Sequence, residues 1–464
     1  IEFNLFLLPF FPWTTGIVRT WFILNGYIPF RDFTWLRAPL DLFLLSFWFK
    51  IFGPSANSYQ FFVFLILCLI SITLFLISYR FLTKFKFVPF IFFIFFLLSI
   101  FQNAEMGELL VGLWNLLLVG VIFLHLSTKS RRLLLIAGLL TGISFITKQN
   151  SIGAIFAVLI TILVDQQIRG LSLKIRIKNI GIFVTGVLSP PIILLAYYWS
   201  QGSLMTLLNY SVGVVLGVYR DHPLPPGFSL GRGMWIECGY FLILIPVLVF
   251  RKYAKLNTQQ VIFLVAILAG LIPTVLPSFL AYRAFPSLPI VSIIVGYSIL
   301  IFFANDPKNK NPVFRRAFIL LSLSLFILIN LRFINFYIAS FKGEEIKVSN
   351  FIKDYTEDEV NVAEWLKENT GQNEKIISHT SDIVYFLSNR FPHNKFVDAV
   401  PVMLLNSNSS EVFLSSPPRI YVLDNRTVKD FPDLKEWEFY KFVQKEYTSV
   451  KQYGDIIIYE YNKK

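Results

Sequence analysis

The sequence is dominated by a succession of apolar segments long enough to cross a lipid bilayer as helices. About ten segments approach the roughly 20 apolar residues that a spanning helix needs. They are 57–79, 87–101, 108–126, 132–147, 152–165, 179–198, 234–250, 259–279, 287–303 and 317–340. Residues 1–12 look like the end of an earlier span, so we expect that the chain, which begins at Ile1, lacks the start of a first membrane helix. Residues 39–52 predict a reentrant or interfacial helix.

The composition agrees with a membrane protein. Hydrophobic residues make up 55% of the chain, charged residues 15%, and the mean hydropathy is +0.61. These values exclude a soluble globule of ordinary composition. Cys68 and Cys238 lie far apart in apolar segments and support neither a disulfide framework nor a cysteine metal site. We therefore predict an all-α membrane body, a helical bundle of about 10–12 spans.

Basic residues gather in every second connection between the apolar segments. The five basic connections contain Arg80, Lys84 and Lys86; Lys129, Arg131 and Arg132; Arg169, Lys174, Arg176 and Lys178; Arg251, Lys252 and Lys255; and Lys308, Lys310, Arg315 and Arg316. The positive-inside rule places these connections in the cytoplasm. The net charge of +13 is spread over such clusters and forms no continuous basic face, so we expect no nucleic-acid partner.

The remaining connections and the tail are then predicted to face outward. They include the loop 13–56 and the polar tail from about residue 341. We predict two domains, a transmembrane domain at 1–340 and a small extracytoplasmic α/β domain at 341–464. In the tail, "EDEVNVAEWLKENT" has helical spacing, while "KIISHT", "RIYVLD" and "GDIIIYEY" predict strands. The tail contains neither a P-loop nor a GxGxxG motif.

Ionisable residues of the outward segments are the candidates for chemistry, because charge near the bilayer is costly and tends to face a cavity or a partner. They are Arg19, Arg31, Asp32, Arg37, Glu105, Glu108, Lys148, Arg220, Asp221, His222, Arg232, Glu237 and Arg283. Carboxylates among several cations suit transfer from a phosphorylated donor. A carboxylate accepts a proton from the attacking hydroxyl, and Arg or Lys stabilises the phosphate charge.

Each candidate also has a plain structural interpretation. Arg31 and Arg37 beside Asp32 are also consistent with a surface ion pair. Glutamates at a helix start are common partners of the helix dipole, which applies to the pair at 105 and 108. Lys148 is placed where a terminal lysine snorkels to the interface. His222 has no His or Cys neighbour spaced for a metal.

Several motifs, in order, resemble the membrane-embedded GT-C glycosyltransferases related to the protein mannosyltransferases and the aminoarabinose transferase of lipid A. The first motif consists of Gly26, Pro29, Phe30, Arg31, Asp32, Pro39, Leu40, Phe52 and Gly53. The second is "GLLTGISFITKQ", Gly138 to Gln149, and the third is "RAFPSLPIVSI" from Arg283. The tail "VAEWLKENTGQNEKIISHTSDIVYFLSNRFP" resembles the soluble domain of bacterial members.

The resemblance implies transfer of a sugar from a polyprenyl-phosphate donor to a lipid, glycan or protein acceptor on the outer side of the cell membrane, among membrane lipids. The family usually carries an acid before the first motif, but residues 11–14 here are "FPWT". We therefore expect Asp32 to be the base, with Glu105 or Glu108 as the second carboxylate. The substrate-binding residues would be Arg31, Arg37, Lys148, Arg220, Asp221, His222 and Arg283. We expect these groups to converge in one outward cavity.

Other functions stay open at this point. A flippase or transporter of lipid-linked saccharides also has many spans, although no internal repeat is evident here. A glycan polymerase or ligase, or a noncatalytic relative, would have the same topology. The sequence assigns no cofactor or metal ligand and leaves a divalent cation open.

Overall fold

The computed structural model describes most of the chain, in two compact units. The described residues are 14–35, 37–82, 85–100, 106–214, 232–253, 256–275, 281–304, 312–341, 356–395, 408–430, 435–436 and 438–462. The first unit contains the described parts of Phe61–Leu195 and Leu224–Lys347. The second contains those of Phe11–Gln60, Ala196–Pro223 and Val348–Lys464. The predicted loop 13–56 thus belongs to the same unit as the tail, and the predicted domain boundary at 340/341 stays a prediction.

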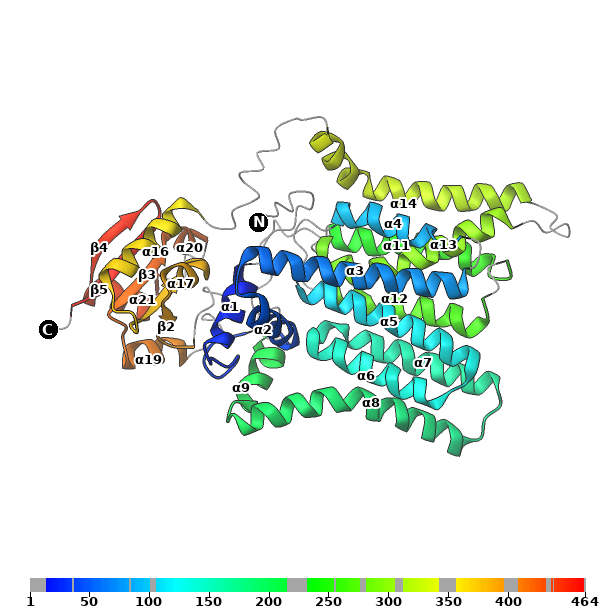
Figure 1. Cartoon of the computed structure of the whole chain (residues 1–464), viewed down its shortest axis with the longest axis horizontal. Coiled ribbons are helices and arrows are strands. Elements are labelled where there is room, and N and C mark those ends of the chain that lie inside the picture. The colour runs from blue at the N-terminus through cyan, green and yellow to red at the C-terminus, as the bar shows by residue number, and fades with distance from the viewer. Residues whose placement is uncertain are drawn as a thin grey trace. The chain divides into compact units, whose positions relative to one another are not determined.

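The first unit is built of helices that run side by side (Figure 1). Its elements are α3 (Ala56–Phe81), α4 (Val88–Ile100), α5 (Met106–Thr128), α6 (Arg131–Thr147), η2 (Gln149–Ile152), α7 (Gly153–Ile168), α8 (Leu173–Ser200), α11 (Arg232–Val249), α12 (Thr258–Val275), η4 (Ala281–Ser287), α13 (Leu288–Phe303) and α14 (Pro312–Phe341). The unit boundaries fall within α3 and α8.

Several of these helices have the length and composition of membrane spans. Five meet both criteria in the described part of the chain, namely Ala56–Phe81, Met106–Thr128, Gln149–Ile168, Leu173–Ser200 and Arg283–Phe303. Side chains such as Leu188, Ile192 and Ile193 on α8 are exposed, as lipid-facing residues are. The predicted multi-pass helical membrane protein is confirmed, and the larger number of spans stays a prediction.

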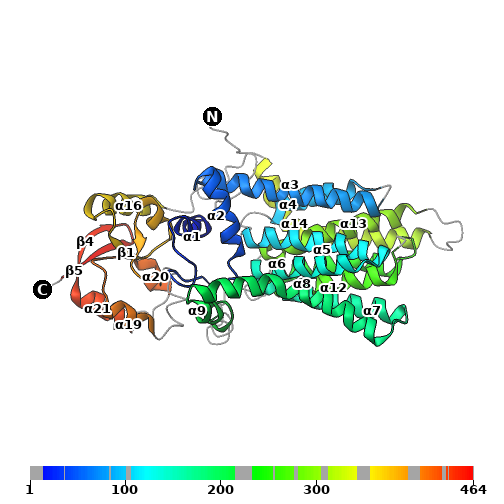
Figure 2. The same cartoon turned by 60° about the horizontal axis from the view of Figure 1, so that its bottom comes forward.

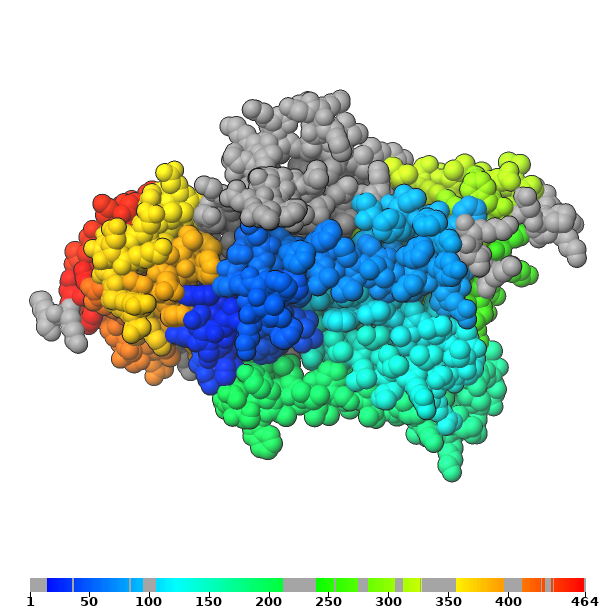
Figure 3. Space-filling view, in the orientation of Figure 1, coloured from blue at the N-terminus to red at the C-terminus, as the bar shows by residue number. Residues whose placement is uncertain are grey.

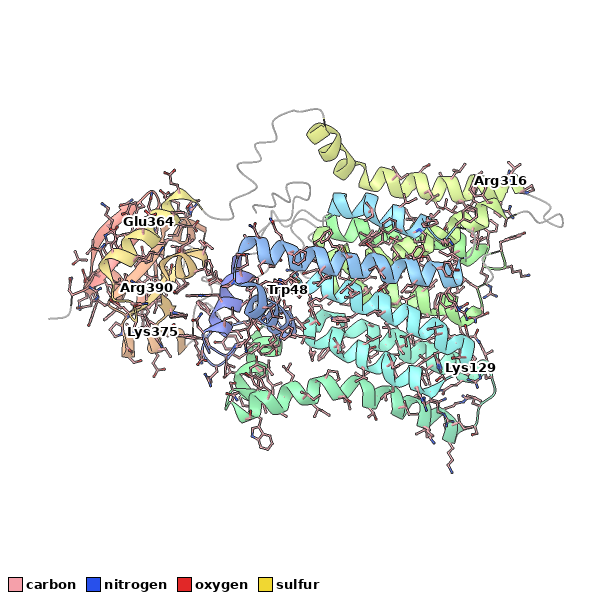
Figure 4. All side chains as sticks on the ribbon, in the orientation of Figure 1. Trp48, Lys129, Arg316, Glu364, Lys375 and Arg390 are labelled. Atoms are coloured by element: carbon pink, nitrogen blue, oxygen red, sulfur yellow. The ribbon has the colours of Figure 1, made fainter. Side chains whose placement is uncertain are left out.

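Basic residues from different connections lie at the same end of the first unit. Figure 4 shows Lys129, which follows α5, and Arg316, near the start of α14, both at that end. Lys129 and Arg169 share the buried carboxylate of Asp165, with N–O distances of 2.7 and 3.2 Å. This basic end corresponds to the connections that the positive-inside rule predicts to be cytoplasmic.

The second unit begins with short helices. Its elements before the tail are α1 (Thr14–Leu24), α2 (Leu40–Phe52), α9 (Leu204–Leu208) and the π-helix η3 (Asn209–Val214). The predicted helix at 39–52 is confirmed as α2, but α1 was not predicted. The described part of α1 has 11 residues. Trp48 of α2 donates to the carbonyl of Ser58 at 2.9 Å, and Figure 4 labels this tryptophan.

The tail forms a five-stranded mixed sheet with helices. Its elements are α16 (Glu357–Asn369), β1 (Lys375–His379), α17 (Ile383–Ser388), β2 (Phe391–Pro392), α19 (Asn408–Ser415), β3 (Ile420–Asp424), α20 (Asn425–Asp430), α21 (Glu438–Glu446), β4 (Tyr447–Tyr453) and β5 (Ile456–Tyr461). The strand order is β2-β1-β3-β5-β4, with β2, β1 and β3 parallel and β5 and β4 antiparallel. The helix and three strands predicted from the sequence are confirmed.

Local sequence signals explain several of these elements. Thr356 and Glu359 form a capping box at the start of α16. The core on one face of the sheet contains Tyr421, Leu423 and Phe439. Figure 2 shows α16 and α21 on opposite sides of the sheet, and Figure 3 shows the described part of this domain, yellow to red, as a compact body.

Candidate functional site

The most deeply buried predicted site residues form an ion pair in the first unit. The Nζ of Lys148 donates to Oε1 of Glu108. Glu108 is 0% exposed and Lys148 5% exposed. Lys148 therefore does not snorkel to an exposed position. The structure brings together two residues that are 40 positions apart in the sequence.

Helix ends position this pair. Glu108 lies in the first turn of α5, where the helix dipole favours an anion. Lys148 immediately follows the last residue of α6 and adopts an extended backbone, with φ −155° and ψ 115°. Its N–H makes the last helical hydrogen bond of α6, to the carbonyl of Ser144 at 3.0 Å, and its extended backbone ends the helix before η2 begins. Each charge thus lies at the helix end that stabilises its sign.

The glycine motif before Lys148 has a packing explanation. Gly138 and Gly142 of α6 lie against α8, and a Cβ on Gly186 of α8 would come within 2.5 Å of the Leu135 carbonyl. Only glycines permit such a close approach of two helix backbones. One turn further along, Trp114 of α5 donates to the hydroxyl of Thr147 at 3.2 Å. The motif therefore fixes α6 between its neighbours and sets the position of Lys148.

Arg283 lies on a third element that contacts α5. It belongs to η4, and a Cβ on Gly112 of α5 would lie 3.1 Å from the ring of Phe285. Gly112 is one turn after Glu108, so η4 packs over the start of α5. Arg283 is half-buried.

Other buried polar groups on these helices were not predicted as site residues. Asn115 is 0% exposed and follows Glu108 by two turns, so both share one face of α5. Within the described residues, neither amide atom of Asn115 has a hydrogen-bond partner, and the same holds for the hydroxyl of Ser144. An amide in the middle of an apolar span is costly, and that signal could have identified Asn115 from the sequence.

Arg31 and Asp32 form a second, more exposed pair in the second unit. Nη2 of Arg31 lies 2.7 Å from Oδ2 of Asp32, and the side chains are 41% and 26% exposed. The hydrogen bond that Arg31 donates to the Asp32 carboxylate raises the pKa of Arg31. The same carboxylate accepts the N–H of Ile28 at 2.7 Å and so closes the turn that contains Phe30, whose φ is +66°. Asp32 therefore holds the local fold of the loop.

The remaining predicted site residues either make contacts within the second unit or lie outside the described residues. Nη1 of Arg31 donates to Oε1 of Gln201 at 3.3 Å. The guanidinium of Arg37 lies 5.8 Å from the ring centre of Trp35. The convergence of the loop residues with Glu108 and Lys148 in one cavity stays a prediction. Four predicted residues lie outside the described residues: Glu105, Arg220, Asp221 and His222.

The described residues contain no group of three or more His, Cys, Asp or Glu side chains arranged to hold a metal ion. The two pairs instead offer carboxylates beside cations. Such a pair can exchange its internal ion pair for contacts to an anionic ligand.

No protein-family model matches the sequence, and no curated protein matches it. Among solved structures, the chain is similar to the crystal structure of ArnT from Cupriavidus metallidurans bound to undecaprenyl phosphate. The two share 11% sequence identity with a TM-score of 0.48, and the match covers 96% of this chain and 92% of that chain. The function proposed below is carried by the residues of this chain and not by that likeness.

Proposed function

We propose that the protein is a membrane glycosyltransferase that moves a sugar from a polyprenyl-phosphate donor to a hydroxyl acceptor on the outer side of the membrane. The acceptor is an envelope lipid, glycan or protein. The observation that carries the proposal is the buried ion pair between Glu108, in the first turn of the apolar span α5, and Lys148, which directly follows α6. Ionisable groups in such positions are expensive, and functional roles are their usual reason.

The location of the pair supports an outward site. Glu108 begins α5 and Lys129 follows its end, about 30 Å away along the helix. Likewise, Lys148 directly follows the end of α6, whereas Arg131 begins the helix. The pair is therefore at the end of these helices opposite the basic connections, which the positive-inside rule assigns to the cytoplasm. A lipid-borne phosphate at the headgroup level would be at the height of the pair.

The chemistry follows from the two charges. The acceptor hydroxyl oxygen attacks the anomeric carbon of the sugar, and the bond from that carbon to the phosphate oxygen breaks with its electron pair leaving on the polyprenyl phosphate. Lys148 would turn from Glu108 to the phosphate and stabilise the charge that develops there. The released carboxylate of Glu108 would accept the proton of the hydroxyl. Arg283, on the neighbouring η4, is proposed as a further phosphate-binding cation.

The contacts of the two carboxylates favour Glu108 over Asp32 as the base. Asp32 accepts the Ile28 N–H and the Arg31 guanidinium, so its lone pairs are largely used by the loop itself. Glu108 is fully buried beside a cation that an anionic donor can attract. Asp32 is then proposed to organise the loop and present Arg31, which is exposed, to the phosphate. We propose the same binding role for Arg37.

Transfer can be tested with the purified protein in liposomes that contain a polyprenyl-phosphate sugar labelled in the sugar. We expect label in an acceptor lipid or glycan extract, and loss of that product by about 100-fold in Glu108→Gln and Lys148→Met. Asp165→Asn is the matched control, because it also removes a buried carboxylate paired with a lysine, but at the opposite, basic end. It should retain transfer per folded molecule.

Two outcomes would contradict the proposal. Movement of the labelled lipid between leaflets without a new glycosidic bond would indicate a transporter. Wild-type turnover by Glu108→Gln together with Lys148→Met would remove the pair from the mechanism.

A further inference from the structure

Arg19 is a buried cation that joins three segments of the second unit. Its Nε and Nη2 donate to the two carboxylate oxygens of Asp382 at 3.1 and 3.2 Å, and its side chain is 0% exposed. Its Nη1 donates to the carbonyl of Thr34 at 3.3 Å, and its guanidinium lies 5.6 Å from the ring centre of Phe33. One side chain of α1 thus holds both the C-terminal domain and the polar loop that follows α1.

The backbone of the loop is fixed by the same domain. The N–H of Thr34 donates to the carbonyl of Lys395 at 2.8 Å, while its carbonyl accepts from Arg19. Thr34 is only two residues from Asp32. The backbone is therefore held by the C-terminal domain and by Arg19 just after the turn that contains Arg31 and Asp32.

Aromatic packing extends this attachment. Trp21 of α1 stacks on Phe391 with ring centres 4.6 Å apart and an angle of 7° between the ring planes. Tyr27, at the start of the loop, also stacks on Phe391, with ring centres 5.0 Å apart. Lys375 of β1 lies 5.6 Å from the ring centre of Tyr27. Both ends of the loop thus contact the C-terminal domain.

The opposite side of the turn contacts the end of α8 within the same unit. Phe30 packs edge-on against Tyr198 with ring centres 5.4 Å apart. Arg31 reaches Gln201 at 3.3 Å. The turn is therefore held from two sides, by the C-terminal domain and by the segment that follows α8.

Asp382 occupies a particular place in its domain. It follows the carboxyl end of β1, which is flanked on both sides by parallel strands, and it precedes α17. In open α/β sheets, the crevice outside the carboxyl ends of parallel strands is where ligands usually bind. Here that position is taken by a guanidinium of the chain's own α1.

We propose that the C-terminal domain positions the outward loop for donor binding and that Arg19 and Asp382 are the positioning residues. The proposal rests on the function proposed above. Asp382, beyond the carboxyl end of β1, binds Arg19, and Arg19 in turn binds the carbonyl of Thr34. These contacts would fix the position of the turn that presents Arg31 and Asp32 to the donor phosphate. A bidentate, buried pair is suited to this role because it fixes direction as well as distance.

The test uses the full-length protein in detergent and limited cleavage by trypsin, mapped by mass spectrometry. Arg31 and Arg37 lie in the loop and are themselves cleavage sites. We expect Asp382→Asn and Arg19→Lys to accelerate cleavage after Arg31 and Arg37 by about tenfold, since each loses a charge-assisted contact. The Michaelis constant for the polyprenyl-phosphate sugar should rise by a similar factor with a smaller change in kcat.

Two further variants separate positioning from folding. The double variant Arg19→Met with Asp382→Val replaces the buried pair by apolar side chains of nearly the same combined volume, a replacement that proteins often tolerate. It should keep the melting temperature near wild type while still exposing the loop. Glu374→Gln is the matched control, because it removes an exposed ion pair with Arg419 in the same domain. It should change neither cleavage nor the Michaelis constant.

Equal cleavage after Arg31 and Arg37 in wild type, Asp382→Asn and the double variant would overturn the inference, whether or not transfer is detected. Accelerated cleavage with an unchanged Michaelis constant would also overturn it. If the wild-type protein transfers no sugar at all while the cleavage pattern shifts as expected, the proposed function fails and the attachment of the loop remains as found.

Discussion

Gly153 of α7 and Gly270 of α12 face each other with their backbones in contact. A Cβ on Gly270 would lie 2.5 Å from the carbonyl oxygen of Gly153, and a Cβ on Gly153 would overlap the carbonyl of Gly270. Small residues at such a crossing allow van der Waals contact between whole helices, which is a main source of association between membrane helices. Gly153 also begins α7 directly after η2, so the crossing supports the segment that follows Lys148.

Replacing Gly153 or Gly270 with Ala should therefore destabilise the membrane unit. We expect a loss of about 1–3 kcal/mol, typical of an overpacked core, because backbone atoms must move apart. Unfolding in increasing SDS, followed by circular dichroism, measures this loss. Gly181→Ala is the matched control, since a Cβ at that helical position meets no atom within 4 Å. Equal stability of all three variants would show that the crossing tolerates a methyl group.

The features that follow from local sequence were predictable. Hydropathy located the five described helices that are long and apolar enough to span a membrane, and short apolar runs located β1, β3 and β5, because both signals depend only on neighbouring residues. The α1 helix was not predicted, because its partners are the neighbouring α2 and the distant α17 of the C-terminal domain. β2 has only two residues and β4 is largely exposed, so neither carries a clear pattern.

The partners within the candidate site could not be predicted in the same way. Glu108 and Lys148 were both candidates, but their ion pair depends on the antiparallel packing of α5 and α6. Arg19 was only one of many outward charges, and its partner Asp382 lies 363 residues away. Neither hydrophobic periodicity nor motif spacing reports a contact between residues so far apart in the sequence. The convergence of Asp32 with Glu108 is still a prediction.

Glu108 and Lys148 should behave as one energetic unit in stability measurements. Removing one charge leaves the other buried without its counter-ion, which typically costs about 3–5 kcal/mol. We expect this loss for Glu108→Leu and for Lys148→Met, and near wild-type stability for the double variant. A double-mutant cycle from SDS unfolding gives the coupling energy. If the stability loss of the double variant equalled the sum of the two single losses, Glu108 and Lys148 would not be energetically coupled.

The stability of the C-terminal domain should fall as the pH is lowered through the range of His379. This side chain is 1% exposed, and burial lowers its pKa from 6.5 to about 4. Below pH 6.5, His379 binds a proton in the unfolded chain but stays neutral in the folded domain, so folding becomes less favourable as the pH falls. The loss is complete when His379 also protonates in the folded domain, near pH 4. The full loss is about 3 kcal/mol.

Thermal unfolding of the full-length protein at several pH values measures this effect. The ring nitrogen Nδ1 of His379 lies 2.7 Å from the hydroxyl of Tyr421, so His379→Gln keeps a polar partner there. This variant should show a shallower dependence of the melting temperature on pH between 6.5 and 4. A dependence equal to that of wild type would assign the acid sensitivity to other groups.

Arg390, labelled in Figure 4, should contribute strongly to the stability of the C-terminal domain, because it is buried and donates to carbonyls at two helix ends. Its Nη2 donates to the carbonyl of Thr370 at 2.9 Å and to that of Lys367 at 3.2 Å, at the end of α16. Its Nη1 donates to the carbonyl of Ser388 at 3.1 Å, at the end of α17. A cation there also complements both helix dipoles.

Arg390→Met leaves those buried carbonyls without donors and should cost about 2–4 kcal/mol. Arg390→Lys should recover only part of this loss, because one ammonium cannot reach both helix ends. Arg419→Met is the comparison, since Arg419 makes exposed ion pairs in the same domain that contribute at most about 1 kcal/mol. Thermal unfolding of the three full-length variants ranks their losses of stability. If Lys restored full stability, charge alone and not the forked geometry of Arg390 would join α16 to α17.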